Sequence, residues 1–268
     1  MQQLTQSVLD IVYQAGLHLT EFYAGSVKIH IKSDRTPVTE ADLFLSKFLI
    51  HSLSKLTPNI PILSEENCQV SLAERSQWKE YWLIDPLDGT QQFIDRTGQF
   101  SVMIALVRNN KPVLGIIHAP IIDKTYYAIE NQGAFLVEKG KTSRLQKNCK
   151  KDKKSDRLVV TTRKDTRLIV EDSLISSHQL DFFFMGSSSL KAGLVAEGKV
   201  DCYVSLGKTG EWDTAAAEVI LSELGGEIYN LNFEPLTYNQ RETFINPPFV
   251  MVGDKSIDWQ NIYQFDSY

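Results

Sequence analysis

Cysteine is scarce in this sequence, and an excess of positive charge is missing. The three cysteines, Cys68, Cys149 and Cys202, lie far apart, so their spacing matches neither a zinc site nor a disulfide framework and suits a reducing compartment. The 28 lysines and arginines are outnumbered by 33 aspartates and glutamates, which gives a net charge of -5. Without a basic excess, the chain is a poor candidate for binding nucleic acid.

Long apolar runs are also missing. No run approaches the roughly 20 residues that a membrane helix needs, and the N-terminus lacks the basic and then apolar order of a secretion signal. We therefore expect a cytoplasmic protein without a transmembrane segment. The basic cluster at residues 147–154 predicts a solvated loop, with contact to an anionic surface as the alternative.

Several common catalytic motifs are absent as well. The five histidines show no zinc-type spacing, and the sequence contains neither a Gly-x-Ser-x-Gly nucleophile elbow nor a P-loop lysine motif. A hydrophobic content of 43% over 268 residues is enough for a large core. The polar stretch Glu138–Arg157 separates an N-terminal α+β half from a C-terminal half in which strands and helices alternate, so we expect two packed subdomains, 1–150 and 151–268.

The stretch with the strongest chemical signal begins at a short apolar run, Tyr81–Ile84, which predicts a buried strand. Asp85 and Asp88 follow it on either side of Pro86, and Gly89 permits a backbone turn that most residues resist. Oxygen ligands at the end of a strand suit divalent cations, and free N–H groups in the turn suit a phosphate. A plain turn between two strands is the alternative.

Further acids stand at the ends of predicted elements. Glu65 follows the apolar run Ile60–Leu63, and Asp213 precedes an alanine-rich helix. Each has a structural alternative, since Glu65 can be solvated surface and Asp213 can be a helix N-cap. Asp42 stands three residues after Thr39, which is the spacing of a capping box. Together with the two acids of the central stretch, Glu65 and Asp213 supply the carboxylates that a two-magnesium phosphatase site requires.

Three motifs resemble the inositol monophosphatase superfamily, whose members are lithium-sensitive, Mg²⁺-dependent phosphomonoesterases. They are Ser64–Glu66, Trp82–Thr90 and Trp212–Ala216, and they occur in the family's order along nearly the whole chain. Within the superfamily, the chain is most similar to the bacterial 3′(2′),5′-bisphosphate nucleotidases. This closer similarity rests on Lys111–Gly115, Gly186–Lys191, Leu194–Gly198 and Arg241–Pro247. The resemblance implies an α/β fold, a layered α-β-α-β-α sandwich with the site where the two subdomains meet.

The resemblance also implies the metal ligands. Glu65, Asp85 and the carbonyl of Leu87 would hold one Mg²⁺. Asp85 would bridge to a second ion, which Asp88 and Asp213 would complete. Two or three ions are implied in all.

A role in catalysis is implied for neighbouring groups. Thr90 and Glu65 would orient and activate the attacking water, and Asp42 would support Thr90. The backbone N–H groups of Gly89 and Thr90 would cradle the phosphate. The implied substrate-binding set is Glu65, Leu87, Asp88, Gly89, Thr90, Ser188, Lys191 and Asp213.

Nucleotide recognition is implied at Ser188 and Lys191, where Lys191 would pair with the second phosphate of the substrate. An ordinary serine-capped helix with a solvent-exposed lysine is the alternative. The chain departs from the nucleotidases at Thr161–Lys164, where they often carry Ser-Arg-Ser-His, and at Ser205, where they tend to place an arginine. We therefore expect contacts to the 5′-phosphate that differ in detail.

The expected reaction is hydrolysis of the 3′-phosphate of adenosine 3′,5′-bisphosphate, a by-product of sulfate assimilation, to give AMP and phosphate. An inositol monophosphatase or other sugar phosphatase is the enzymatic alternative. A non-catalytic nucleotide- or cation-binding module is the alternative from another class. The resemblance also suggests peripheral contact with the cytoplasmic face of the inner membrane, and it leaves the oligomeric state open.

Overall fold

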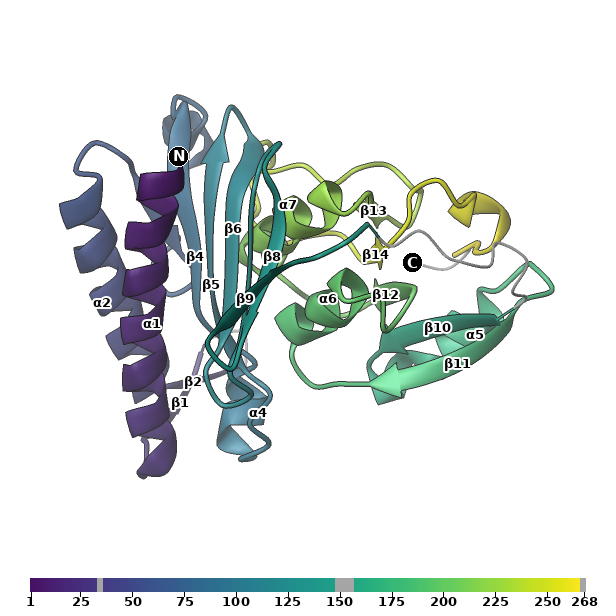
Figure 1. Ribbon diagram of the computed structural model, residues 1–268, viewed down its shortest axis with the longest axis horizontal. Coiled ribbons are helices and arrows are strands. Elements are labelled where there is room, and N and C mark those ends of the chain that lie inside the picture. Colours follow the sequence, from purple (N-terminus) through teal and green to yellow (C-terminus); the bar gives the residue numbers. More distant parts are fainter. Residues whose placement is uncertain (33–35, 148–156, 266–268) are drawn as a thin grey trace.

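The computed structural model describes residues 1–32, 36–147 and 157–265, and its elements stack in five layers (Figure 1). Two long helices form the first layer, a seven-stranded sheet the second, two helices the third, a five-stranded sheet the fourth and a short helix the fifth. In that order the helices are α1 (Gln2–Ala24) and α2 (Glu40–Leu56), then α6 (Ser188–Ala196) and α7 (Ala215–Glu223), and last α5 (Arg167–Asp172). The predicted α-β-α-β-α sandwich is confirmed.

Helix α2 begins at the capping box that the sequence predicts. The hydroxyl of Thr39 accepts a hydrogen bond from the N–H of Ala41, and the carboxylate of Asp42 accepts one from the N–H of Thr39 at 2.7 Å. The apolar side chains of α2 then pack with those of α1 against the outer face of the larger sheet. The capping box therefore fixes where α2 starts, directly beside the strands that carry the site.

The larger sheet is a meander with the order β3-β4-β5-β6-β7-β8-β9, in which β3 and β4 are parallel and the other pairs antiparallel. Its predicted hairpin turns at Asn109 and Asn110, whose φ angles are 50° and 61°. The sequence does not predict β9, because its residues are polar and exposed. The strands are β3 (Ile62–Ser64), β4 (Glu80–Asp88), β5 (Ser101–Arg108), β6 (Lys111–Ala119), β7 (Lys124–Ile129), β8 (Gly133–Glu138) and β9 (Lys141–Arg144).

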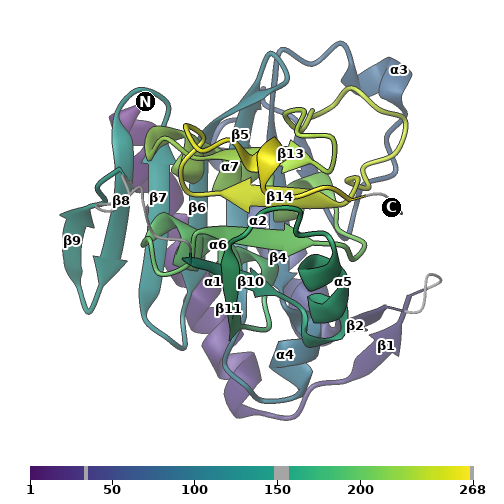
Figure 2. The ribbon, with the colours of Figure 1, turned by 90° about the vertical axis from the view of Figure 1, so that its right-hand side faces the viewer.

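The smaller sheet has the order β11-β10-β12-β14-β13 and faces the viewer in Figure 2. Strand β10 is parallel to β11 and β12, whereas β14 is antiparallel to β12 and β13. The sequence predicts the first three of these strands in chain order and misses β13 and β14. The strands are β10 (Arg157–Thr162), β11 (Gln179–Phe184), β12 (Cys202–Ser205), β13 (Glu227–Asn230) and β14 (Phe249–Val252).

Shorter elements complete the described part of the fold. The predicted strand at Val27–Ile31 is confirmed as part of a small hairpin, while residues 33–35 of the predicted loop after it lie outside the described ranges. The short elements are β1 (Ile29–Ile31), β2 (Pro37–Thr39), α3 (Leu72–Arg75), α4 (Thr90–Ile94) and the 3₁₀ turns Lys164–Thr166, Glu211–Asp213 and Trp259–Asn261.

Both faces of the larger sheet are covered, which explains why its strands read as continuous apolar runs. Side chains alternate along a strand. Trp82 and Ile84 therefore pack under α1 and α2, while Tyr81 and Leu83 pack on the opposite face with α6 and α7. The second half of the chain thus shares a core with the sheet of the first half.

The division into subdomains 1–150 and 151–268 stays a prediction, since its boundary falls within residues 148–156, outside the described ranges. All of the basic stretch 147–154 except Lys147 lies there too. Among the helices of the described residues, none has the length and apolar character needed to cross a membrane.

Candidate metal and phosphate site

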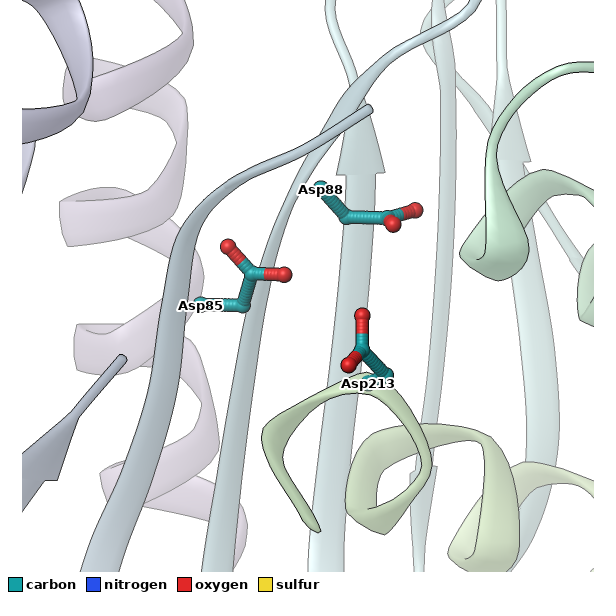
Figure 3. A group of neighbouring side chains, drawn as sticks. All are labelled: Asp85, Asp88 and Asp213. Carbon is teal, nitrogen blue, oxygen red and sulfur yellow. The ribbon is translucent and has the colours of Figure 1, made fainter. Parts of the chain in front are cut away.

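Three carboxylates from two separate elements meet at one end of β4. Asp85 and Asp88 come from that strand, and Asp213 comes from the 3₁₀ turn that precedes α7. One oxygen of each acid lies within 4.8 Å of the others, and the side chains gather around a shared space (Figure 3). Among the described residues, these are the acids that group closely enough to hold one metal ion.

A β-bulge turns the first two acids to the same face. Asp85 pairs with Met103 and Asp88 pairs with Ser101, so β4 contains one more residue than β5 between these two pairs. Without the extra residue, side chains three positions apart would point to opposite faces. The strand therefore continues through Asp88, and the turn predicted directly after Ile84 is wrong.

Gly89 follows the last residue of the strand, and the turn that the sequence predicts at this glycine is confirmed. Its φ angle is 92°, a left-handed conformation that favours glycine, and a Cβ atom here would lie 2.9 Å from the carbonyl oxygen of Gln99. The chain turns directly into α4, whose first residue is Thr90. Gly89 and Thr90 both line the cleft that contains the three acids.

Asp88 is held by the start of helix α6. Its Oδ2 atom accepts a hydrogen bond from the N–H of Ser189 at 2.8 Å and from the hydroxyls of Ser187 and Ser189. The resemblance assigns Ser188 to the substrate and gives no role at Asp88 to the serines on either side of it. The signal was present as three consecutive serines before an apolar helix, but only the fold brings them to Asp88.

Asp42 and Thr90 are in contact, as the resemblance implies. The hydroxyl of Thr90 lies 2.9 Å from Oδ1 of Asp42 and 3.2 Å from the carbonyl oxygen of Leu87. The other carboxylate oxygen of Asp42 serves the capping box of α2. One buried acid therefore performs both tasks that the sequence offered as alternatives, and burial raises its pKa.

Glu65 lines the same cleft but lies outside the group of three acids. Its Oε1 atom forms an ion pair of 2.8 Å with the ammonium group of Lys32, which also pairs with Glu66 at 2.5 Å. The charge of Glu65 nonetheless acts on the pKa values of Asp85 and Asp213. The structure thus places Glu65 beside the cluster, with its carboxylate engaged by a lysine.

Asp213 has a different local role from the predicted one. Thr214 takes the N-cap position of α7, so the prediction that Asp213 caps this helix is wrong. Asp213 ends the 3₁₀ turn, and its Oδ2 atom accepts a hydrogen bond of 2.5 Å from the N–H of Gly210. The extra turn moves the carboxylate off the helix end and into the cluster.

The two buried acids, Asp85 and Asp88, and the half-buried Asp213 concentrate negative charge in a small space. Burial, the charge of Glu65 and the other two acids raise the pKa of Asp85 well above its ordinary value. Burial and then the charges of Asp88 and Glu65 raise the pKa of Asp213 in the same way. Oxygen donors whose mutual repulsion is this strong fit a hard divalent cation, which removes the repulsion by coordination.

The cleft that contains the acids has a volume of about 1240 Å³, and another of its walls carries a lysine and a serine. Lys191 is buried there, its Nζ donates to the carbonyl oxygen of Gly186 at 3.0 Å, and it lies 5.0 Å from the ring centroid of Tyr203. Burial lowers the pKa of Lys191 to about 8. The alternative of a solvent-exposed lysine is therefore wrong. Ser188 contacts the hydroxyl of Tyr203 at 3.3 Å on the same wall.

The positions at which the sequence departs from the nucleotidases also line the cleft. Thr162, Arg163, Lys164 and Ser205 lie along it, so changes there bear on ligand contacts. Arg163 is ion-paired with Asp165 at 2.8 Å.

A layered sandwich with clustered acids at the end of a central strand is the architecture of a metal-dependent phosphatase. Comparison with protein families agrees, since the model of the inositol monophosphatase family matches residues 1–256. The chain belongs to the inositol monophosphatase family, and the resemblance noted in the sequence is confirmed.

Individual relatives show which members of the family the chain is similar to. The chain is 57% identical over 267 residues to the 3′(2′),5′-bisphosphate nucleotidase CysQ of Haemophilus influenzae, covering 99% of this chain and 98% of that protein. The crystal structure of CysQ from Bacteroides thetaiotaomicron matches with a TM-score of 0.79 and 31% identity, covering 94% of this chain and 97% of that one. An IMPase/NADP phosphatase complexed with Mg²⁺ and phosphate shares the fold at a TM-score of 0.80 and 18% identity, covering 97% and 94%.

Proposed function

We propose that this protein is a Mg²⁺-dependent phosphomonoesterase that removes the 3′-phosphate of adenosine 3′,5′-bisphosphate and releases AMP and phosphate. The observation that carries the proposal is the group of three acids, Asp85 and Asp88 buried and Asp213 half-buried, with oxygens within 4.8 Å, in a cleft that also holds a buried lysine. The 57% identity to a bisphosphate nucleotidase over nearly the full chain supports the choice of substrate.

In this proposal, Mg²⁺ is bound by oxygen ligands alone. Glu65, Asp85 and the Leu87 carbonyl would hold one ion, and Asp85, Asp88 and Asp213 would hold another. Bound Mg²⁺ supplies a water of lowered pKa and neutralises charge on the phosphate. The raised pKa values of Asp85 and Asp213 support this assignment, because coordination stabilises their charged forms.

The chain's own groups orient the attacking water. The hydroxyl of Thr90 has a single proton, and Asp42 at 2.9 Å is its nearer acceptor. With its proton directed to Asp42, the oxygen of Thr90 presents a lone pair to the water and accepts a hydrogen bond from it. Glu65 shares this task, and the N–H groups of Gly89 and Thr90 hold the phosphate. In-line attack by water forms no phosphoenzyme and inverts the configuration at phosphorus.

The second phosphate selects the substrate. Lys191 is already desolvated in the cleft, so an ion pair with a phosphate there is stronger than one at the surface. Ser188 stands on the same wall and completes the nucleotide contact.

A location in the cytoplasm and two subdomains, 1–150 and 151–268, belong to the same proposal, as does peripheral contact with the inner membrane through the stretch 147–154.

Phosphate release from adenosine 3′,5′-bisphosphate, compared with release from inositol 1-phosphate, tests the reaction. We expect turnover of the nucleotide in Mg²⁺, none in EDTA, and a clear preference for the nucleotide. Preference for the inositol ester would contradict the nucleotide assignment, and equal activity in EDTA would contradict the metal assignment.

The metal ligands are tested by Asp88→Asn. This substitution preserves shape and removes one charge from the proposed second metal site, so we expect loss of activity by about a hundredfold or more. Asp95→Asn, at the exposed acid that follows helix α4, is the control and should leave activity unchanged. A folded Asp88→Asn protein that still turns over the substrate at the normal rate would refute the assignment.

A further inference from the structure

The C-terminal loop that contains Arg241–Pro247 clamps the turn that carries Asp213. Asn246 is buried, and its Nδ2 atom donates to the carbonyl oxygen of Gly210 at 2.6 Å and lies 3.2 Å from the hydroxyl of Thr214. Gly210 and Thr214 flank the 3₁₀ turn on its two sides. One side chain therefore ties both ends of the turn.

An ion pair between the partly exposed Arg241 and a buried glutamate reinforces the same clamp. Glu211, the first residue of the turn, is fully buried, and its Oε1 atom accepts from Arg241 at 3.1 Å. The same Nη2 atom of Arg241 lies 3.2 Å from Oδ1 of Asn246. The N–H of Glu211 donates to the carbonyl oxygen of Phe244 at 2.9 Å. Because a buried carboxylate is costly without partners, these contacts strongly favour a single arrangement of loop and turn.

The clamp reaches Asp213 through one peptide unit. The N–H of Gly210 donates to Oδ2 of Asp213 at 2.5 Å, and the N–H of Asn246 donates to the carbonyl oxygen of Thr209 at 2.9 Å. The chain on both sides of the Gly210 nitrogen is thus held by Asn246, and the same nitrogen orients the carboxylate. A shift of this backbone would move Asp213 relative to Asp85 and Asp88.

We propose that Asn246 is a positioning residue that, with Arg241 and Glu211, holds the carboxylate of Asp213 where a divalent cation takes it up. Asn246 does not itself line the cleft, and its side chain bonds to the carbonyl oxygen of Gly210, so it acts on Asp213 through the Gly210 backbone. The inference rests on the metal role of Asp213 in the proposed function. Partners of this kind typically change metal affinity by 10- to 100-fold.

The same chain offers a matched control at Asn239. This residue is equally buried, its Oδ1 atom accepts from Arg75 at 2.8 Å, and its Nδ2 atom donates to the carbonyl oxygen of Arg75 at 2.8 Å. It therefore has the same chemistry as Asn246, with an arginine on one side and a backbone carbonyl on the other. Its backbone N–H donates to Oε2 of Glu211 at 2.9 Å, whereas the hydrogen bonds of its side chain go to Arg75 and Asn110, so a substitution of the side chain removes none of the bonds to the turn around Asp213.

The experiment compares Asn246→Asp with Asn239→Asp, and Asn246→Ala with Asn239→Ala. Mg²⁺ is titrated into metal-free protein in the presence of inorganic phosphate, and binding is followed by calorimetry. We expect both Asn246 variants to bind Mg²⁺ about tenfold more weakly than the unchanged protein, and both Asn239 variants to bind within twofold of it. In EDTA, the melting temperature should fall by a similar amount for the two variants of each matched pair, one at Asn246 and one at Asn239.

The aspartate variant separates positioning from charge. A new negative charge near the cluster would by itself strengthen Mg²⁺ binding, whereas loss of the Gly210 contact weakens it. Unchanged or tighter binding by both Asn246 variants, or equal weakening by the Asn239 pair, would overturn the inference. If Asp213→Asn also leaves Mg²⁺ binding unchanged, the metal assignment fails. If Asp213→Asn weakens binding and the Asn246 variants do not, only the positioning role fails.

Discussion

At the scale of single residues, the site depends on side chains that serve two purposes. Asp42 caps helix α2 with one carboxylate oxygen and accepts from Thr90 with the other. Asp88 presents a carboxylate to the cluster while Oδ2 accepts from Ser187 and Ser189. Such sharing restricts each carboxylate to one orientation, which suits a site that must hold its ligands before the metal arrives.

Thr90→Val tests the orientation of water. Valine has nearly the same shape, but it can neither donate to Asp42 nor accept from a water. We expect kcat to fall by about 100-fold or more with little change in KM. Thr90→Ser keeps the hydroxyl and should retain most of the activity. A valine variant with normal kcat in a phosphate-release assay would show that Thr90 takes no part in the reaction.

Lys191 gives the substrate contact a pH dependence. Because burial lowers its pKa to about 8, the ammonium group loses its proton as the pH rises through this value. We expect the KM for adenosine 3′,5′-bisphosphate to rise as the pH passes from about 7 to 9, while Lys191→Arg, which stays charged, removes this rise.

Lys191→Met supplies the complementary measurement. Loss of one charge-assisted contact should raise the KM for the bisphosphate about tenfold or more and leave the KM for 3′-AMP, which lacks the second phosphate, nearly unchanged. An equal rise for both substrates would contradict a contact with the second phosphate.

At the scale of elements, the turn between β4 and α4 depends on a glycine with close neighbours, and the proposed phosphate contact lies in this turn. Gly89 has a φ angle of 92° and close neighbours, whereas Gly140 has a φ angle of 70° and nothing within 4 Å of its hypothetical Cβ atom. The two glycines therefore separate backbone strain from steric overlap. In Gly140→Ala, the new methyl group adds backbone strain but overlaps with no neighbouring atom.

We expect Gly140→Ala to lower the free energy of unfolding by about 1–2 kcal/mol, the cost of a left-handed conformation. Gly89→Ala should cost about 1–3 kcal/mol more, because its Cβ atom meets the carbonyl oxygen of Gln99 at 2.9 Å. Urea unfolding of both variants measures the difference. Equal losses would mean that the surroundings of Gly89 relax without cost.

At the scale of the whole molecule, the cleft joins parts of the chain that lie far apart in sequence. Its acids come from β4 and from the turn before α7, and its lysine comes from α6 in the layer between the two sheets. Folding therefore brings together charges that repel one another, and the repulsion has a measurable effect on stability when metal is removed.

The raised pKa values of Asp85 and Asp213 define the sign of that effect. Since the folded protein holds these protons more tightly than the unfolded chain, the stability they contribute is present below the ordinary pKa and is lost as pH rises through the raised values. In EDTA, we expect Asp213→Asn, which removes one repelling charge, to gain Tm relative to the unchanged protein as pH rises from about 4 to 7. In Mg²⁺, we expect the opposite order, with a higher Tm for the unchanged protein than for Asp213→Asn. A Tm difference independent of pH would contradict the coupling.

Much of the fold could be predicted because its signals are local. The capping box at Thr39 and Asp42, the apolar strand before Asp85 and the left-handed Gly89 each depend on a few neighbouring residues. The predictions fail where a local pattern is weak or is overruled. Strand β9 is polar and gains its place only by pairing with β8, and β4 runs on through Pro86 because a bulge absorbs the extra residue.

The sequence by itself determined most of the helices and strands, the acids of the central strand and the family to which they point, because capping, alternation and turn chemistry act over a few residues. Only the tertiary structure decided that Lys191 is buried, that Ser187 and Ser189 hold Asp88, and that Asn246 clamps the turn of Asp213. Those contacts join segments far apart in the chain, and their geometry follows from how the layers pack.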